Sequence, residues 1–301
     1  MMMNKGRTKI LFIVNPISGG KNKSHFPNTI ENYFQNRNEY KISILFTEYK
    51  GHAKEIVSTN IHNHDLIVAV GGDGTINEIG TAMITSDVPL GIIPLGSGNG
   101  FAFGLGFKKS NNITPYLDII IQQNIKTIDT ALFNNIPFLN IAGFGFDGLI
   151  VYLFQRQTGR GLFGYAKLIM TSYFTYKTFS LITKTINGKK NHFENVLFVN
   201  IANGTQPGNH FSVSPSSSFT DGKLDVIIFQ KAPFLSIPKL IYQLRYGTIL
   251  NSKLVTHMKS KSFQFNPKTD QHFNIDGEYA GKGKEVWIRI NPSSLRIIVP
   301  L

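Results

Sequence analysis

The segment Gly71-Gly72-Asp73-Gly74-Thr75 combines three glycines with an acid and a hydroxyl group. The apolar run before it predicts a buried strand, and the residues after it predict a helix. Glycines let phosphate oxygens approach the backbone, and the N–H groups at a helix start attract anions. Asp73 would place a carboxylate beside the phosphates, where a divalent cation can bridge the two. The segment therefore predicts a phosphate-binding loop.

Two other loops, at residues 15–21 and 94–100, have the same glycine-rich and polar character. Each alone is as consistent with an ordinary turn between a strand and a helix as with a binding loop. Together with the first segment they would form a nucleotide cradle. The residues that these two loops would contribute are Asn15, Ser18, Gly19, Gly96 and Ser97.

The elements that must position these loops alternate in type over the first 100 residues. Short apolar runs predict buried strands at Lys9–Val14, Lys41–Phe46, Asp65–Val70 and Pro89–Ile93. Helices are expected between them, at about Ser24–Arg37, His52–Ile61 and Thr75–Thr85. This alternation predicts an α/β domain with a parallel, doubly wound sheet. Ligands bind such sheets at the carboxyl ends of the strands, where all three loops fall.

After about residue 130 the pattern changes to short β-like segments separated by turn signals. The expected strands are Pro137–Ala142, Asn195–Ala202, Leu224–Phe229, Ser262–Asn266, Val286–Ile290 and Leu295–Val299. Helical insertions are expected near residues 161–177 and 234–250. We therefore predict two domains: an α/β nucleotide-binding domain at 1–130 and a mainly-β sandwich at 131–301.

Composition restricts the chemistry further. The chain has 301 residues and no cysteine, which excludes disulfides, thiolate zinc sites and a cysteine nucleophile. No histidines have H-x-x-x-H spacing, and no G-x-x-x-x-G-K-[ST] segment occurs. No apolar stretch approaches 18 residues, so we expect no membrane span. Two G-x-G-x-x-G segments, starting at Gly143 and Gly159, lack the acid about 20 residues later that a dinucleotide site requires.

The net charge of +13 is concentrated in the second half. Residues 1–147 carry 12 Lys and Arg against 11 Asp and Glu, whereas residues 148–301 carry 19 against 7. Two windows, Gly148–Phe193 and Val226–Thr269, contain no acid. This asymmetry indicates an anionic partner: a nucleic acid, a membrane surface or an acidic substrate.

Two acidic turns in the second half have two interpretations each. Residues 218–225 form either an ordinary turn before a strand or a metal site that uses Asp221 and nearby carbonyl groups. The sequence Asp276-Gly277-Glu278 is either a hairpin turn or an acid delivered to the active site.

Taken in order, the motifs resemble the diacylglycerol-kinase catalytic-domain family, which includes bacterial lipid kinases and sphingosine kinases. The resemblance spans residues 15–278. It implies an ATP- and Mg²⁺-dependent lipid kinase whose last strand returns to the first domain. The residues that carry it are Asn15-Pro16, Ser18-Gly19, Thr47, Gly51-His52-Ala53, Gly71–Thr75, Asn77-Glu78, Pro94, Gly96-Ser97-Gly98-Asn99, Asn140, Gly143, Gly145-Phe146-Asp147, Asp221–Asp225 and Asp276-Gly277-Glu278.

The resemblance also implies residue roles. Glu278 is the expected general base, with Asp73 as the rival, and a structural Mg²⁺ is expected around Ser218, Asp221 and Lys223. Gly100 and Phe103 replace an acid and an arginine common in bacterial members, so the lipid cannot be carried over. The expected nucleotide contacts are Asn15, Ser18, Gly19, Thr47, Gly71, Gly72, Asp73, Gly74, Thr75, Ile76, Asn77, Gly96 and Ser97.

The expected partners are a membrane lipid substrate and an anionic membrane surface, with no nucleic acid. We expect a cytoplasmic protein bound peripherally to the inner face of the membrane, and the family also includes homodimers. One alternative is a kinase for a soluble substrate, of the NAD-kinase or phosphofructokinase type, and another is a lipid-binding protein without turnover. Apolar residues at helical spacing in 234–245 would lie in the membrane interface or pack on the sandwich, and Lys253, Lys259 and Lys261 would strengthen membrane binding.

Overall fold

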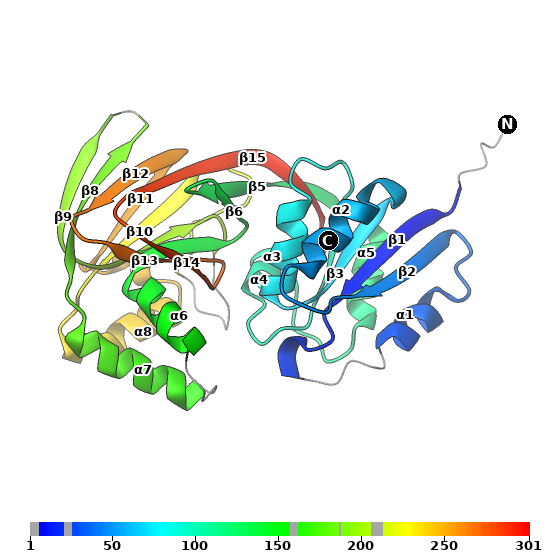
Figure 1. The fold of residues 1–301 in the computed structure, drawn as a ribbon, viewed down its shortest axis with the longest axis horizontal. Coiled ribbons are helices and arrows are strands. Elements are labelled where there is room, and N and C mark those ends of the chain that lie inside the picture. The colour runs from blue at the N-terminus through cyan, green and yellow to red at the C-terminus, as the bar shows by residue number, and fades with distance from the viewer. Residues whose placement is uncertain (1–5, 21–25, 157–161, 187, 206–212) are drawn as a thin grey trace. The chain divides into compact units, whose positions relative to one another are not determined.

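The computed structural model describes residues 6–20, 26–156, 162–186, 188–205 and 213–301 (Figure 1). The chain divides into two compact units. The first consists of residues 1–128 and 293–301, and the second of residues 129–292. Strands β5 (Ile125–Phe133) and β15 (Val286–Ile298) each contribute to both units.

The sheet of the first unit has the strand order β2-β1-β3-β4, and all neighbours are parallel. The carboxyl-terminal end of β15 adds to its edge, where Ile297 pairs with Leu90 of β4. Every residue of β3 and β4 is buried, which explains why their sequences are continuous apolar runs. The strand bounds are Thr8–Val14 (β1), Tyr40–Phe46 (β2), Leu66–Gly71 (β3) and Leu90–Pro94 (β4).

Helices cover both faces of this sheet. The chain moves from β1 outward to β2 and then back across β1 to β3, so right-handed crossovers place α1 and α2 on opposite faces. Helix α3 packs against α2, and α5 packs against α1. The helix bounds are Phe26–Phe34 (α1), His52–Asn60 (α2), Asp73–Ala82 (α3), Gly100–Gly104 (α4) and Thr114–Gln122 (α5), with short 3₁₀ turns at Ser18–Gly20 (η1) and Ile61–Asn63 (η2).

The second unit is an antiparallel β-sandwich. The long strand β9 pairs with β8 through its first half and with β7 and β10 through its second half, so it joins the two layers. Further strand bounds are Ile136–Phe138 (β6), Ile141–Gly145 (β7), Phe179–Thr185 (β8), Lys190–Ala202 (β9), Leu224–Gln230 (β10), Val255–Ser260 (β11), Ser262–Pro267 (β12), Gln271–Ile275 (β13) and Glu278–Gly283 (β14).

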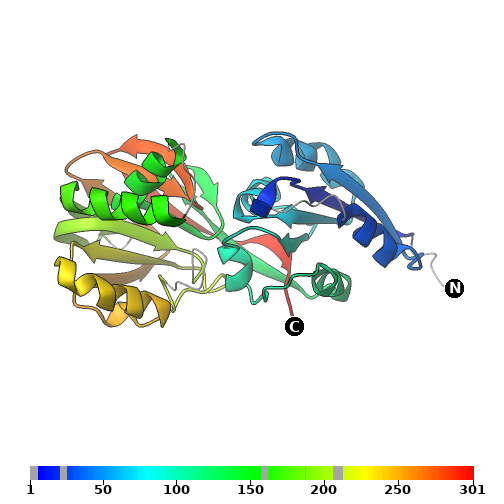
Figure 2. The same ribbon diagram turned by 90° about the horizontal axis from the view of Figure 1, so that it is seen from below.

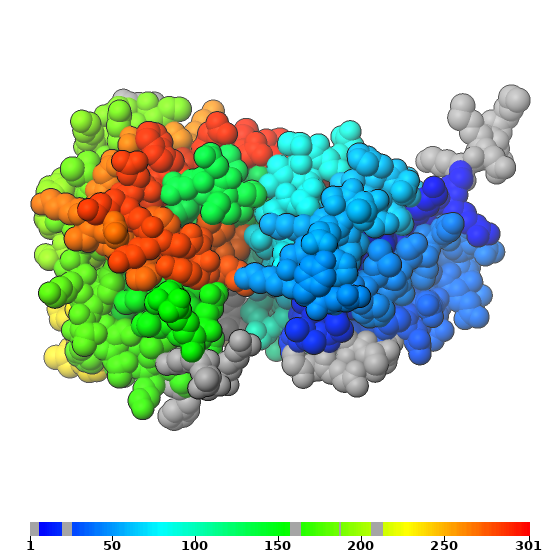
Figure 3. All heavy atoms as spheres, viewed as in Figure 1, coloured from blue at the N-terminus to red at the C-terminus, as the bar shows by residue number. Residues whose placement is uncertain are grey.

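The sandwich core is rich in phenylalanine. The rings of Phe144, on β7, and Phe265, on β12, pack edge to face with centroids 5.4 Å apart, and Phe133 and Phe273 pack at 5.2 Å. All four side chains are buried. In the space-filling view, the orange-to-red strands β12–β15 form much of the visible face of this unit beside green segments from much earlier in the chain (Figure 3).

Three helices accompany the sandwich: α6 (Phe146–Arg156), α7 (Leu162–Thr175) and α8 (Ile237–Arg245). The helical insertion expected near 234–250 consists of three pieces: η3 (Phe234–Ser236), α8 and η4 (Ile249–Asn251). Pro238 stands at the start of α8 and Gly247, with a φ of 67°, lies beyond its end. No helix in the described part of the chain is long and apolar enough to cross a membrane.

The predicted fold class is confirmed, with local differences in the strands. The expected strand 137–142 is two strands, because the N–H groups of Leu139, Asn140 and Ile141 donate to the carboxylate of Asp276. The two strands expected at 286–290 and 295–299 are one strand, β15, which continues through Ser293 at a φ of 47°. Five further strands were not expected from the sequence: β5, β8, β11, β13 and β14.

Candidate active site

The three glycine-rich loops of the first unit lie in direct contact with one another. A Cβ atom on Gly96 would lie 2.6 Å from the Cα atom of Gly72, and one on Gly72 would lie 3.3 Å from the Ser18 hydroxyl oxygen. Gly19, with a φ of 70°, lies so close to the carbonyl of Leu95 that no side chain fits there. Glycine is therefore required at these positions by backbone packing, and the loops form one continuous backbone surface.

Side-chain hydrogen bonds hold two of these loops in shape. Asn15 donates from Nδ2 to the Thr75 hydroxyl oxygen at 3.0 Å, which ties the first loop to α3. Asn99, at a φ of 54°, accepts from the Gly96 N–H and donates to the Gly96 carbonyl, both at 2.8 Å. Asn15 and Thr75, which are expected to contact the nucleotide, thus also hold the loops in place.

Asp73 is the first residue of α3 and the acid nearest the centre of this cluster. Its Oδ1 atom accepts the Phe101 N–H at 3.3 Å, and a Cβ atom on Gly98 would lie 3.2 Å from Oδ2. Burial raises the pKa of Asp73, although backbone N–H groups of residues 99–101 oppose that effect. A cation beside this carboxylate would compensate the cost of burying its charge.

The other expected nucleotide contacts differ in their exposure. Gly74 and Ser97 are exposed, and Thr47 and Asn77 are half-buried. Ile76 is fully buried, and its N–H donates to the Gly72 carbonyl at 3.0 Å. The side chain of Ile76 therefore packs in the core of the first unit. The first N–H groups of α3, by contrast, precede any intrahelical acceptor and suit an anion.

In the second unit, the turn Asp276-Gly277-Glu278 joins β13 to β14. The Asp276 carboxylate accepts three backbone N–H groups, from Leu139 at 2.8 Å, Asn140 at 3.0 Å and Ile141 at 2.9 Å. Asp276 and Gly277 both have positive φ angles, at 47° and 84°. Glu278 is thus exposed at the end of a turn that its neighbour fixes in place, and the sequence alone did not reveal that role for Asp276.

Helix α6 packs against β13 and β14, the two strands that the same turn joins. Asp147, in its first turn, is half-buried and accepts the Asn274 amide N–H at 2.8 Å, two residues before Asp276. Burial raises the pKa of Asp147 to about 7, despite the hydrogen bonds from Asn274 and the Gly148 N–H. Gln155, near the end of α6, lies 3.4 Å from the Glu278 carboxylate. Helix α6 is not among the helices expected from the sequence, so the sequence did not indicate this support.

An aromatic cluster lies beside Glu278. The Tyr152 ring packs against Tyr279 at 4.8 Å and against His272 at 4.9 Å, and the guanidinium of Arg156 lies 4.3 Å above the Tyr152 ring. Burial and the nearby Lys282 lower the pKa of His272, so this imidazole is mainly neutral near pH 7. The cluster combines apolar area with a cation next to the predicted base.

The loop expected to hold a structural Mg²⁺ contains an ion pair. Lys259 Nζ lies 2.7 Å from Asp221 Oδ2 and 3.3 Å from Asp225 Oδ2, while Asp221 Oδ1 accepts the Lys223 N–H at 3.0 Å. No cluster of three or more acidic or histidine side chains suited to a metal occurs within the described residues. A metal ion bound to Asp221 would therefore have to displace the Lys259 ammonium group, and this metal site stays a prediction.

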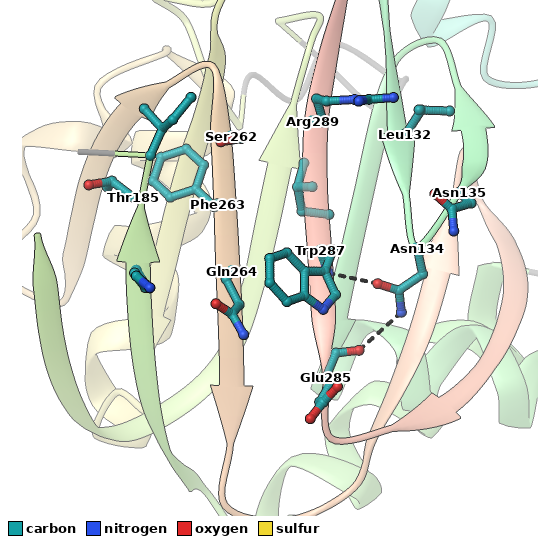
Figure 4. Close-up of a pocket in the computed structure, with 13 residues that line it drawn as sticks. Leu132, Asn134, Asn135, Thr185, Ser262, Phe263, Gln264, Glu285, Trp287 and Arg289 are labelled. Atoms are coloured by element: carbon teal, nitrogen blue, oxygen red, sulfur yellow. Dashed lines mark hydrogen bonds between the residues drawn. The ribbon is translucent and has the colours of Figure 1, made fainter. Parts of the chain in front are cut away.

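A groove of about 740 Å³ lies on the outer face of the second unit, over β8, β12 and β15. None of the predicted site residues lines it. Asn134 accepts the Trp287 N–H at 2.7 Å and donates to the Glu285 carbonyl at 3.0 Å, which fixes one wall of the groove (Figure 4). The groove thus shares no lining residue with the glycine-rich loops or the Glu278 turn.

Comparisons with known proteins agree with this arrangement. Residues 9–133 match the model of the diacylglycerol kinase catalytic domain, and residues 141–299 match that of the YegS C-terminal NAD kinase beta sandwich-like domain. A diacylglycerol kinase of Bacillus subtilis (strain 168) is 29% identical over 91% of this chain and 90% of its own length. A protein of Klebsiella pneumoniae (strain 342), named a probable YegS-like lipid kinase, is 30% identical over 86% of each chain.

Solved structures share the fold. A diacylglycerol kinase from Bacillus anthracis superposes with a TM-score of 0.71 at 23% identity, over 97% of both chains. An NAD kinase from Archaeoglobus fulgidus in complex with ATP superposes with a TM-score of 0.54 at 15% identity, over 96% of this chain and 93% of its own. The glycine-rich loops, the acidic turn and these matches over both units lead to one conclusion: the chain belongs to the diacylglycerol kinase catalytic-domain family of lipid kinases.

Proposed function

We propose that this protein transfers the γ-phosphoryl group of ATP to the hydroxyl group of a membrane lipid, with Mg²⁺, at the inner surface of the membrane. The observation that carries the proposal is the contact of three glycine-rich loops around Asp73 at the start of α3. Phosphoryl transfer requires mainly positioning and charge neutralisation. Backbone N–H groups at a helix start and a carboxylate that binds a cation supply both.

The residues around Asp73 fit a nucleotide-bound Mg²⁺. This ion usually takes one or two carboxylates, with phosphates and water completing its coordination, rather than a cage of protein ligands. Asp73 supplies one carboxylate, whose burial favours a cationic neighbour. The ion would neutralise charge on the phosphate oxygens, and Asn15, Ser18 and the backbone of Gly72 would position those oxygens.

We further propose that Glu278 accepts the proton of the lipid hydroxyl group. The hydroxyl oxygen then bonds to the γ-phosphorus as the bond to the β,γ-bridging oxygen breaks, and ADP leaves. Asp276 and Asn274 hold the turn that carries Glu278. The exposure of Glu278 supports this role, because a lipid hydroxyl must reach its carboxylate.

A soluble-substrate kinase is the second candidate, because the fold is shared with an NAD kinase. The matched family models and the two relatives of about 30% identity favour a lipid. The deciding experiment incubates the protein with labelled ATP and Mg²⁺, and with either a total lipid extract or NAD. A labelled phospholipid is expected. Labelled NADP with no lipid product would overturn the proposal.

Asp73→Asn is the matched variant for this assay. The amide is nearly the same size as the carboxylate but lacks its charge, so Mg²⁺-dependent transfer should fall by about 10²–10³-fold or more. The circular dichroism spectrum should be unchanged. A variant that keeps over about a tenth of the wild-type rate would contradict the role of Asp73.

A further inference from the structure

Large apolar side chains are exposed together on one side of the second unit. Leu235, in η3, has 91% of its surface exposed, and Phe174, in α7, has 59%. The rings of Phe174 and Phe234 pack together with centroids 5.3 Å apart, so the two helical segments share one surface. Viewed from below, α7 (green) and α8 (yellow) lie on the same side of the unit (Figure 2). Met170, Ile241, Tyr242 and Tyr246 are also exposed.

Core packing explains only one stripe of α8. Leu240 and Leu244 pack against the cluster around Ile227 and Phe229, and Ile237 packs against the α7 cluster. Ile241 and Tyr242 lie on the opposite side and are 50% and 60% exposed. One stripe thus packs in the core, as one of the two interpretations expects, and the other stripe faces outward. Single exposed apolar residues are common, but a contiguous group indicates a contact surface.

Charge indicates which partner this surface fits. Helix α7 lies within the acid-free window 148–193, and η3 and α8 lie within the acid-free window 226–269. These windows are far apart in sequence, and the contacts of Phe234 with Phe174 and of Ile237 with the α7 cluster bring the start of the second helical segment to α7. Lys167 and Lys177 lie exposed in and just beyond α7, and Lys239 and Arg245 in α8. A cluster of aromatic and aliphatic side chains with cations and no acid is typical of a surface that binds anionic lipid.

We propose that α7, η3 and α8 form a membrane-docking face, with Phe174, Phe234 and Leu235 inserting into the interface of an anionic bilayer. This inference rests on the proposed function and names the surface that brings the enzyme to its lipid. Tyr242 and Tyr246, whose rings pack at 4.4 Å, suit the headgroup level, where amphipathic rings gather. Lys259 is not part of the membrane-docking face, because its ammonium group pairs with Asp221 and Asp225.

The test compares an apolar pair of changes with a matched control. Phe174→Ser with Leu235→Ser removes the exposed insertion side chains, while Ile186→Ser removes an exposed apolar side chain, 67% accessible, at the end of β8. Binding is measured by co-sedimentation with two kinds of vesicle. One contains phosphatidylcholine alone, and the other also contains about a third of the anionic lipid phosphatidylglycerol, which probes the effect of surface charge. The pair should weaken binding to anionic vesicles about ten-fold or more, and the control should leave it unchanged.

A second arm tests the charge. Lys167→Gln with Lys239→Gln should weaken binding to anionic vesicles by roughly five-fold for each lysine, and high salt should abolish the difference. Lys284→Gln, an exposed lysine on the other side of the Glu278 hairpin, is the control. Equal binding of wild-type protein to neutral vesicles, or no binding to either kind, overturns the proposal. The proposal is also overturned if none of the changes in α7, η3 and α8 alters vesicle binding.

Turnover and oligomeric state separate this inference from its alternatives. The serine pair should phosphorylate a short-chain, water-soluble diacylglycerol at the wild-type rate. If wild-type protein phosphorylates no lipid but binds vesicles through this face, the proposed function fails and the docking face stands. If the serine pair converts a dimer to a monomer in sedimentation and leaves vesicle binding unchanged, the face joins two copies of this chain and the docking proposal is wrong.

Discussion

Replacement of Asp147 by asparagine should remove a pH dependence of stability from the second unit. Desolvation raises the pKa of the Asp147 carboxyl to about 7 in the folded protein, against 3.8 for an ordinary aspartate. The folded state therefore binds more protons than the unfolded chain between these values, and the free energy of unfolding falls as pH rises through that window. Charging this group costs the fold about 4 kcal/mol in all, as an order of magnitude.

The change in unfolding free energy that an experiment can measure is smaller, because most proteins cannot be studied over the whole pH range between the two pKa values. A single group with this pKa lowers the free energy of unfolding by about 2 kcal/mol between roughly pH 5.5 and pH 8. Asp147→Asn keeps the shape and stays neutral, and the Asn274 amide can rotate to offer its oxygen. The variant should therefore gain about 2 kcal/mol over the wild type across that range.

The assay is urea unfolding at several pH values, followed by tryptophan fluorescence. Trp287 is the only tryptophan of the chain and lies on β15 within the second unit, so it reports on the unit that contains Asp147. Burial and the Asp147 charge raise the pKa values of Tyr165 and Tyr176 above their ordinary value, so these groups do not titrate in this range, and His272 is present in both proteins. Asp270→Asn, at an exposed position, is the control. Parallel stability curves for wild type and Asp147→Asn would refute the reasoning.

Three further outcomes are expected. Glu278→Gln should slow phosphoryl transfer by about 10²–10⁴-fold while preserving ATP affinity, as measured by nucleotide titration and turnover; normal turnover would assign the base elsewhere. Asp276→Asn offers one acceptor oxygen in place of two, so the amides of residues 139–141 should exchange hydrogen faster by mass spectrometry, and unchanged protection would contradict its role. Lys259→Met removes the ammonium partner of the buried Asp225, which keeps His257 at 2.6 Å, so it should cost about 2 kcal/mol in urea unfolding, part of which Mg²⁺ should restore; unchanged stability would contradict the role of the ion pair.

The first unit could be predicted closely because its signals are local. Strands such as β3 are buried on both faces, so their residues form uninterrupted apolar runs that end at a glycine-rich loop. Parallel topology then places those loops at one edge of the sheet, as their contacts confirm. The sequence could not show that Gly19 and Gly96 are required by backbone approach between loops about 75 residues apart, since that depends on how the loops pack.

The second unit was harder to predict because its determinants are distant in sequence. Asn140 interrupts the expected strand because its N–H group donates to the carboxylate of Asp276, which lies 136 residues later in the chain. The support of the Glu278 turn by Asp147 and Asn274 joins residues 127 apart. Asp147 belongs to the motif Gly145-Phe146-Asp147, but only the fold shows that it is half-buried and what it contacts.

The two candidate bases differ in the environment that the fold gives them. Asp73 is mostly enclosed by three loops, and a carboxylate that binds a divalent cation has its pKa lowered and is a poor proton acceptor. Glu278 is exposed on a turn that Asp276 fixes with three hydrogen bonds, beside an aromatic cluster with apolar area for a lipid chain. We therefore propose that Asp73 serves the metal-bound phosphates and that Glu278 accepts the proton of the hydroxyl group. Turnover should then depend on the Glu278 carboxylate, and full activity of Glu278→Gln would reverse the assignment.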